Sequence, residues 1–195
     1  MGKPPMSLLS LSIKIILKIG RKLGYWSTQY EASAHSSAGD ELVFPGYPWL
    51  LWHVVTARDR YRAYIRARRL ATNGSLVICD RFPLPEVKLM DGERTGWLLD
   101  MAEISPIARR LAKLERSYYQ NILPPDKLFV LRVDPVIAQE RRPDEEGEWV
   151  KARNQEIWNL EWNAKHYGST LHVIDANQPQ ATVLAEIKRQ IWATL

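Results

Sequence analysis

The chain has 195 residues, of which 46% are hydrophobic and 25% are charged. This length fits about one domain, and the apolar fraction is enough for a core, which excludes a disordered chain. The single cysteine, Cys79, excludes an internal disulfide and a cysteine-rich zinc site. The histidines show no metal-ligand spacing, so we expect a reduced, cytoplasmic domain that holds no transition metal.

Positive charge is concentrated in one part of the chain. The formal net charge is +5 at pH 7, and six arginines but one aspartate lie between Arg58 and Arg69. A basic surface favours anionic partners, which are phosphorylated small molecules, a membrane surface or nucleic acid. Nucleic acid is the weakest of these, because no groove-binding motif accompanies the arginines.

The N-terminal region contains a strongly apolar segment, Met6–Ile19. It is shorter than the ~20 apolar residues of a membrane span, and Lys14 and Lys18 interrupt it. We predict an amphipathic helix over residues 6–24. The side chains expected to face a core are Leu8, Leu9, Ile13, Ile16 and Leu17. A helix that lies on a membrane surface through residues 6–19 and a secretory signal remain alternatives.

A small polar loop over residues 27–40 follows this helix, and together they define an atypical N-terminal segment, 1–48. A long helix is expected over Trp49–Ala71, because Asn73-Gly74 is a helix stop signal. The apolar run Leu76–Cys79 is typical of a buried parallel strand. A loop rich in proline and glycine follows over Pro83–Gly96.

The second half of the chain continues the alternation of helices and strands. Ser105 is expected to cap a helix that starts at Pro106 and extends to Ile122. Lys127–Val133 is typical of a second buried strand. The remaining elements are expected in this order: a helix that opens at Pro135, an exposed charged stretch over Arg141–Arg153, a helix over Glu156–Tyr167, a strand over Leu171–Ile174 and a helix over Ala181–Ala193.

This alternation predicts an α/β domain over residues 49–195, a three-layer parallel sheet with helices on both faces. Ligands in such folds bind at the carboxyl ends of the strands. Those ends carry Asp80-Arg81-Phe82, Asp134-Pro135 and Asp175-Ala176-Asn177. A phosphate or Mg²⁺ site is therefore expected among these residues.

Four short segments, in order, carry a resemblance to a known family. They are Thr56-Ala57-Arg58-Asp59-Arg60, Val77-Ile78-Cys79-Asp80-Arg81-Phe82, the run from Val133 to Arg141, and His172-Val173-Ile174-Asp175-Ala176. With these segments, the chain from Trp49 to Trp192 resembles the thymidylate kinase-like group of P-loop kinases. The resemblance implies a P-loop kinase fold and transfer of the γ-phosphoryl group of ATP to a nucleoside monophosphate such as dTMP.

The resemblance also implies roles for individual residues. Arg60 and Arg81 would hold the acceptor phosphate, with Arg58 as the substitute if the helix register differs. Asp80 would lie near Mg²⁺. The implied lid arginines are Arg141, Arg142 and Arg153, and the residues beside adenine are Asn177, Gln178 and Pro179. Phe82 and Trp52 could stack on a base, although aromatic residues at these spacings are more often part of a core.

The phosphate-loop motif that defines the family, G-x-x-x-x-G-K-[ST], does not occur in the sequence. We therefore expect a truncated copy, without the first strand and phosphate loop, that has little kinase activity alone. The alternative is a catalytically inactive kinase-like module that binds or regulates, associated with a membrane surface. Nucleotides are the expected small-molecule partners, and a homodimer remains open.

Overall fold

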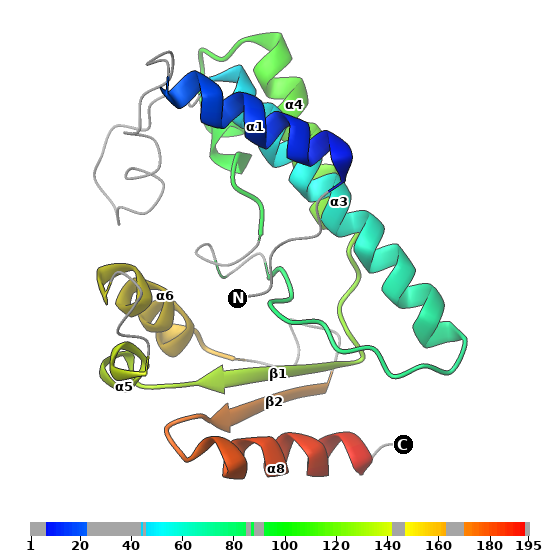
Figure 1. Cartoon of the computed structure of the whole chain (residues 1–195), viewed down its shortest axis with the longest axis vertical. Coiled ribbons are helices and arrows are strands. Elements are labelled where there is room, and N and C mark those ends of the chain that lie inside the picture. The colour runs from blue at the N-terminus through cyan, green and yellow to red at the C-terminus, as the bar shows by residue number, and fades with distance from the viewer. Residues whose placement is uncertain are drawn as a thin grey trace. The chain divides into compact units, whose positions relative to one another are not determined.

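The computed structural model describes residues 7–22, 44, 46–84, 87, 92–141, 147–162 and 170–193 (Figure 1). Contacts divide the chain into two compact units, Met1–Ile122 and Leu123–Leu195, and each is described by itself below. The division into an N-terminal segment 1–48 and a domain 49–195 stays a prediction. Among the described helices, none has both the length and the apolar character that crossing a membrane requires.

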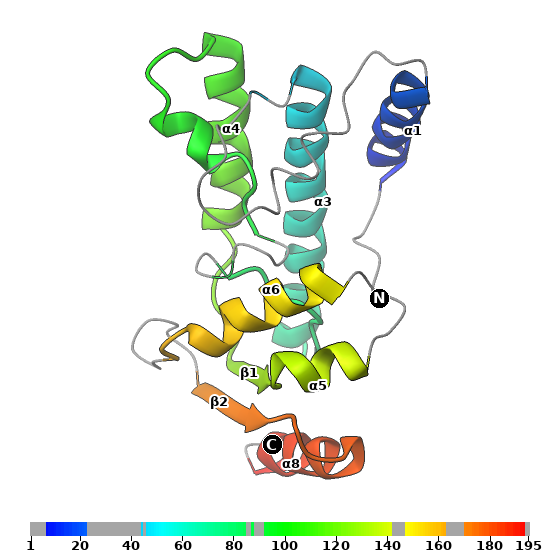
Figure 2. The same ribbon diagram turned by 90° about the vertical axis from the view of Figure 1, so that its left-hand side faces the viewer.

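The first unit is built from helices. Helix α3 (Tyr47–Thr72) packs against both α1 (Leu8–Lys22) and α4 (Pro106–Gln120). Figure 2 shows α1 and α4 on the two sides of α3. A short 3₁₀ helix, η1 (Gly96–Asp100), packs against α4.

Local signals in the sequence set the ends of these helices. The Ser105 hydroxyl accepts a hydrogen bond from the Ala108 amide (3.1 Å), and Pro106 occupies the first turn of α4, as predicted. Helix α3 ends at Asn73, and Gly74 has a φ of 83°, a left-handed conformation that glycine adopts without strain. The predicted bounds of both helices are therefore confirmed to within two residues.

Packing in the first unit centres on one apolar cluster. Leu50 from α3, Leu98 from η1, and Ala108 and Ala112 from α4 are completely buried in it. The two alanines allow α3 and η1 to approach α4 closely. The side chains packed around the cluster are Trp97, Leu99, Met101, Ile104 and Leu111.

A buried carboxylate fixes the loop that leads into η1. Glu115 of α4 is 1% exposed and accepts hydrogen bonds from the amides of Arg94 (3.0 Å) and Thr95 (2.9 Å) and from the Thr95 hydroxyl. Burial raises the pKa of Glu115, although these hydrogen bonds act in the opposite direction. The sequence analysis did not predict this arrangement or η1, because neither has a strong local signal.

The second unit contains a pair of parallel strands. Strand β1 (Lys127–Arg132) pairs with β2 (Thr170–Asp175), with Lys127 opposite Thr170 and Arg132 opposite Asp175. Helix α6 (Gly147–Asn159) packs against β1 and α5 (Pro135–Glu140), while α8 (Gln180–Trp192) packs against β2 (Figure 1). Both strands were predicted, as was the last helix, and all three are confirmed. The larger three-layer sheet stays a prediction.

The strand predicted over Leu76–Cys79 is wrong. These residues form neither a helix nor a strand, and Leu76 and Ile78 are 58% and 78% exposed. A strand needs a partner for its amide and carbonyl groups. Among the described residues β1 and β2 are bonded to each other, and neither pairs with this run. Apolar content therefore did not suffice to make a strand here.

The helix predicted over Glu156–Tyr167 is displaced toward the N-terminus. Helix α6 ends at Asn159, and the Trp162 indole donates a hydrogen bond to the Ile157 carbonyl (2.9 Å), which closes the last turn. Residues 163–169 lie outside the described part. The stretch that was predicted to be charged and exposed, Arg141–Arg153, is helical in its second half, from Gly147.

Helix α1 was predicted correctly in its extent but not in its orientation. Ile13 is buried and Leu17 is half-buried, whereas Leu8, Leu9 and Ile16 are exposed. The prediction that these three side chains face a core is wrong. Large apolar residues lie on nearly every side of this helix, so periodicity alone could not select the face that packs.

Candidate functional site

The predicted site residues fall into both units. In the second unit, the structure brings Arg141 together with the loop that follows β2. Its Nη1 donates to the carbonyl of Ala176 (2.6 Å), and its Nη2 donates to the carbonyls of Asn177 (2.9 Å) and Gln178 (3.2 Å). One guanidinium therefore holds the carbonyl groups of three successive residues, and two of these residues, Asn177 and Gln178, belong to the segment that the resemblance places beside adenine.

The same loop is also tied to β1 and to the start of α5, because the Ala176 amide donates a hydrogen bond to the Arg132 carbonyl (2.7 Å). The Asn177 side chain accepts a hydrogen bond from the Asp134 amide (2.8 Å), and the Asp175 carboxylate accepts one from the Asn177 amide (3.0 Å). Asp134 accepts a hydrogen bond from the Val136 amide (2.8 Å) and caps α5. These contacts give the carboxyl ends of the two parallel strands a defined polar loop.

The structure places only one of the other two expected lid arginines. Arg153 is part of α6, and Arg142 lies outside the described residues. Arg141 follows the last turn of α5. In this structure Arg141 positions a loop, and whether any of the three arginines contacts a phosphate stays a prediction.

In the first unit, Asp80 is exposed, whereas Arg81 and Phe82 are half-buried. Arg81 has a φ of 56°, and no other non-glycine residue in the described part has a positive φ. This left-handed conformation costs a residue with a Cβ atom roughly 1–2 kcal/mol. Such strain often accompanies functional sites.

Arg60 lies on the buried side of α3. Its Nη1 donates to the Tyr119 hydroxyl (2.6 Å), which joins α3 to α4. Burial, followed by the charges of Arg94 and Arg60, lowers the pKa of the neighbouring His53 to about 3. The His53 Nε2 atom is buried and has no hydrogen-bond partner. A cationic cluster is thus present around Arg60, and the sequence analysis missed the part that Arg94 plays in it.

Arg58 and Trp52 occupy different environments. Arg58 donates to Asp59 (3.3 Å) and to the Ser7 hydroxyl (3.2 Å), so it helps to attach the start of α1 to α3. Trp52 is half-buried. These contacts favour a structural role for Arg58, and no contact to a base can be assigned to Trp52.

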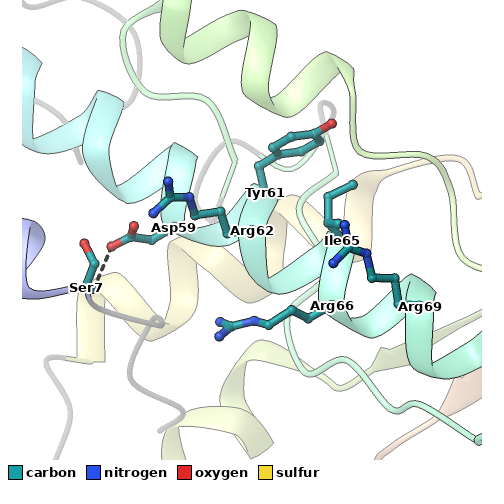
Figure 3. Close-up of a pocket in the computed structure, with 7 residues that line it drawn as sticks. All are labelled: Ser7, Asp59, Tyr61, Arg62, Ile65, Arg66 and Arg69. Atoms are coloured by element: carbon teal, nitrogen blue, oxygen red, sulfur yellow. Dashed lines mark hydrogen bonds between the residues drawn. The ribbon is translucent and has the colours of Figure 1, made fainter.

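A cavity of about 450 Å³ runs along α3 from the start of α1 (Figure 3). Arg62, Arg66 and Arg69 line it, and their i, i+4, i+7 spacing places them on one face of the helix. Asp59 also lines it, but Ser7 donates its amide hydrogen to this carboxylate (2.8 Å). The structure thus places these arginines around a basic hollow with Tyr61 and Ile65 in its wall.

The metal-binding capacity of the described residues is small. No group of three or more histidine, cysteine, aspartate or glutamate side chains lies close enough together there to hold an ion. Asp80 is a single exposed carboxylate. Mg²⁺ commonly keeps several waters and takes one or two carboxylates with substrate phosphates, so a lone aspartate is compatible with it but does not select it.

Comparisons with known proteins give a limited match. No protein-family model and no solved structure matches the chain. Two curated proteins, both named "Uncharacterized ATP-binding protein YghR", from Escherichia coli strain K12 and E. coli O6:H1, are 28% identical to it over 130 residues. The matched region covers 65% of this chain and 49% of each relative, so the chain spans about half the length of the curated relatives it matches.

Proposed function

We propose that this chain binds an adenine nucleotide and belongs to the thymidylate kinase-like group of nucleotide kinases. The observation that carries the proposal is the similarity to proteins named as ATP-binding, which extends over 130 residues. The order of the Asp-Arg motifs and of the ends of β1 and β2 supports the narrower assignment to thymidylate kinase-like enzymes, and the residues before Asp80, which form no strand, do not contribute to it. Transfer of a phosphoryl group from ATP to a nucleoside monophosphate by the whole protein is part of this proposal.

The loop after β2 is the proposed place for adenine. Arg141 holds its carbonyl groups, and the Asn177 side chain ties it to the Asp134 amide at the start of α5. A rigid loop can accept a planar base without a large loss of conformational freedom. In this arrangement Asn177, Gln178 and Pro179 would lie beside the base, and Arg141 would act as a positioning residue.

The acceptor phosphate is assigned to the arginines of the first unit. Arginine matches phosphate oxygens with paired N–H donors and stays charged at any working pH. Arg60 and Arg81 are the candidates, and Arg94 adds positive charge near Arg60. Mg²⁺ bound with ATP would neutralise phosphate charge, and Asp80 is the carboxylate that could hold its water shell.

Catalysis by the 195-residue chain alone is expected to be very weak. Phosphoryl transfer depends on donors that surround the β- and γ-phosphates. The sequence lacks the G-x-x-x-x-G-K-[ST] motif that supplies most of them. We therefore expect nucleotide binding to be measurable where turnover is not.

Isothermal titration with Mg-ATP and, separately, with dTMP tests the proposal. Arg81→Ala should weaken dTMP binding about tenfold or more, since a hydrogen bond to a charged group contributes ~1.5–3 kcal/mol. Mg-ATP binding should change little. Arg110→Ala is the matched control, because Arg110 is an exposed arginine of α4. Failure of both nucleotides to bind, or equal losses in the two variants, would refute the proposal.

A second candidate is a non-catalytic binding module. The exposed apolar side chains of α1 favour it, because a kinase domain does not need them for its chemistry. If neither nucleotide binds but the chain associates with another surface through α1, this second candidate replaces the first.

A further inference from the structure

Helix α1 exposes an unusual number of large apolar side chains. Six of its leucine and isoleucine residues are at least 43% exposed. They are Leu8, Leu9, Leu11, Ile15, Ile16 and Ile19. A contiguous apolar surface of this kind on a water-exposed helix indicates an interaction site.

The packing of α1 against α3 determines which side faces outward. Ile13 and Ser10 are buried, and the Ser10 hydroxyl and the Ser7 amide donate hydrogen bonds to Asp59 of α3. Hydrogen bonds from Ser10, Ser7 and Arg58 outweigh the effect of burial and lower the pKa of Asp59. Leu8, Ile15 and Ile19 lie on the side of α1 opposite to Ser10 and Ile13. An α-helix turns by about 100° per residue, which places these three side chains within one narrow stripe. Figure 2 shows α1 and α4 on the two sides of α3, so α4 does not cover α1.

The charged side chains of α1 are all basic, and the Asp59 carboxylate beside its start is already bound by Ser7, Ser10 and Arg58. Lys14, Lys18 and Lys22 are exposed, and the sequence from Leu8 to Lys22 contains no aspartate or glutamate. The basic hollow begins at Ser7 and continues the positive surface along α3. The partner of this surface should therefore present apolar groups and negative charge together.

An anionic lipid surface meets both requirements. Leucine and isoleucine can enter the boundary between headgroups and acyl chains, while lysine stems extend so that their ammonium groups reach the phosphates. A second copy of the chain would instead bring two acid-free, basic helices together, which repel each other. With 15 residues the helix is about 22 Å long, which suits a position in the membrane plane.

We propose that α1 docks this protein onto membranes that contain anionic phospholipids, with its Leu8–Ile15–Ile19 side against the acyl boundary and its lysines at the lipid phosphates. The proposal does not depend on nucleotide binding. Binding of α1 to lipid would hold the whole first unit at the membrane, because Asp59 and Ile13 fix this helix to α3.

Co-sedimentation of the full chain with vesicles tests the proposal. Vesicles made of equal parts phosphatidylglycerol and phosphatidylcholine should bind the protein, and pure phosphatidylcholine vesicles should bind it much less. Ile15→Asp should lower the partition coefficient about tenfold or more, since burying an isoleucine side chain corresponds to roughly that factor. Ile19→Asp repeats the test at the other end of the stripe. Ile13 is unsuitable, because it is buried against α3.

Two matched controls separate this surface from general hydrophobicity and charge. Ile78→Asp alters an isoleucine of the same unit that is 78% exposed but lies outside α1, and it should leave partitioning unchanged. The double variant Lys14→Glu, Lys18→Glu should weaken binding to the anionic vesicles about 25-fold or more, at roughly fivefold per lysine removed. Lys113→Glu on α4 should have little effect. Far-UV circular dichroism of each variant checks that the helices remain folded.

Three results would overturn the proposal. One is no binding to either kind of vesicle. Another is an equal loss of binding in Ile78→Asp and Ile15→Asp. The third is a dimer, detected by light scattering, that Ile15→Asp dissociates while wild-type protein ignores the vesicles, because this would assign the face to a second copy of the chain.

Discussion

Removal of Glu115 should strongly destabilise the first unit. Its carboxylate is 1% exposed and accepts hydrogen bonds from the amides of Arg94 and Thr95 and from the Thr95 hydroxyl. Thr95 is itself completely buried. Glu115→Ala would therefore leave two donors of Thr95 inside the protein without an acceptor.

The expected loss of stability follows from these contacts. Each buried donor left unsatisfied costs about 2 kcal/mol, so the two donors of Thr95 together cost about 4 kcal/mol. Because the variant no longer buries a carboxylate, about 1 kcal/mol of this loss of stability is recovered. We therefore expect Glu115→Ala to lower the free energy of unfolding by about 3 kcal/mol at pH 7.

Urea denaturation measures this difference. Circular dichroism would follow the helices during the denaturation. The control is Glu103→Ala, which removes an exposed glutamate of the same unit and should change stability by less than about 0.5 kcal/mol. A loss below about 1 kcal/mol for Glu115→Ala would refute the reasoning.

The pH dependence gives a second readout of the same residue. Burial raises the pKa of Glu115 above its ordinary 4.5. At a pH between the ordinary pKa and the raised pKa of Glu115, the folded state holds more protons than the unfolded state. The contribution of the protonated Glu115 to stability is therefore complete below pH 4.5 and declines as the pH rises through the raised pKa. The stability of wild type relative to Glu115→Gln should therefore fall as the pH rises above 4.5. A difference that grows with pH would contradict the assigned direction.

Three further changes test other parts of the structure. Burial alone would raise the Asp59 pKa, but hydrogen bonds from Ser10 and Ser7 help to lower it. Asp59→Asn should therefore lower the free energy of unfolding at pH 7, measured by urea denaturation, by about 2 kcal/mol. This difference should vanish as the pH falls below 3.8. Since burial and neighbouring arginines lower the His53 pKa to about 3, stability should decline in acid below pH 6.5 by at most about 1.4 kcal/mol per pH unit, and His53→Gln should flatten that slope. Arg81→Gly should relieve the strain of the left-handed backbone conformation and stabilise the protein by about 1 kcal/mol, as measured by thermal melts. Titration of the same variant should show weaker dTMP binding. A loss of stability would contradict the assigned strain.

Several elements could be predicted because their signals lie within a few residues of one another. Ser105 followed by Pro106 defines a helix start, and Asn73 followed by Gly74 defines a helix end. The strands β1 and β2 are short apolar runs between turn signals. For the candidate site, the sequence placed Asn177 at a strand end, and the structure shows its side chain bonded to the Asp134 amide.

The parts that failed depended on partners far along the chain. Leu76–Cys79 has the composition of a strand, but a strand forms only when another edge accepts its hydrogen bonds. Arg141 is a different case: the resemblance assigned it to a lid, which stays a prediction, and only the fold could show that its guanidinium bonds to the carbonyls of residues 176–178. The role of Glu115 was equally inaccessible, because its partners lie 20 and 21 residues away.

The sequence by itself determined where most helices and strands lie, and that the chain is basic and rich in arginine. Tertiary structure decided which side of each helix is buried, and so which apolar and basic side chains remain available to a ligand or a lipid. Helix α1 makes the distinction clear. Its composition specifies a helix, but the attachment of Ser10 to Asp59 selects the face that packs and leaves Ile15 in contact with solvent. Helix formation depends on local hydrogen bonds, whereas exposure depends on the neighbours that the fold supplies.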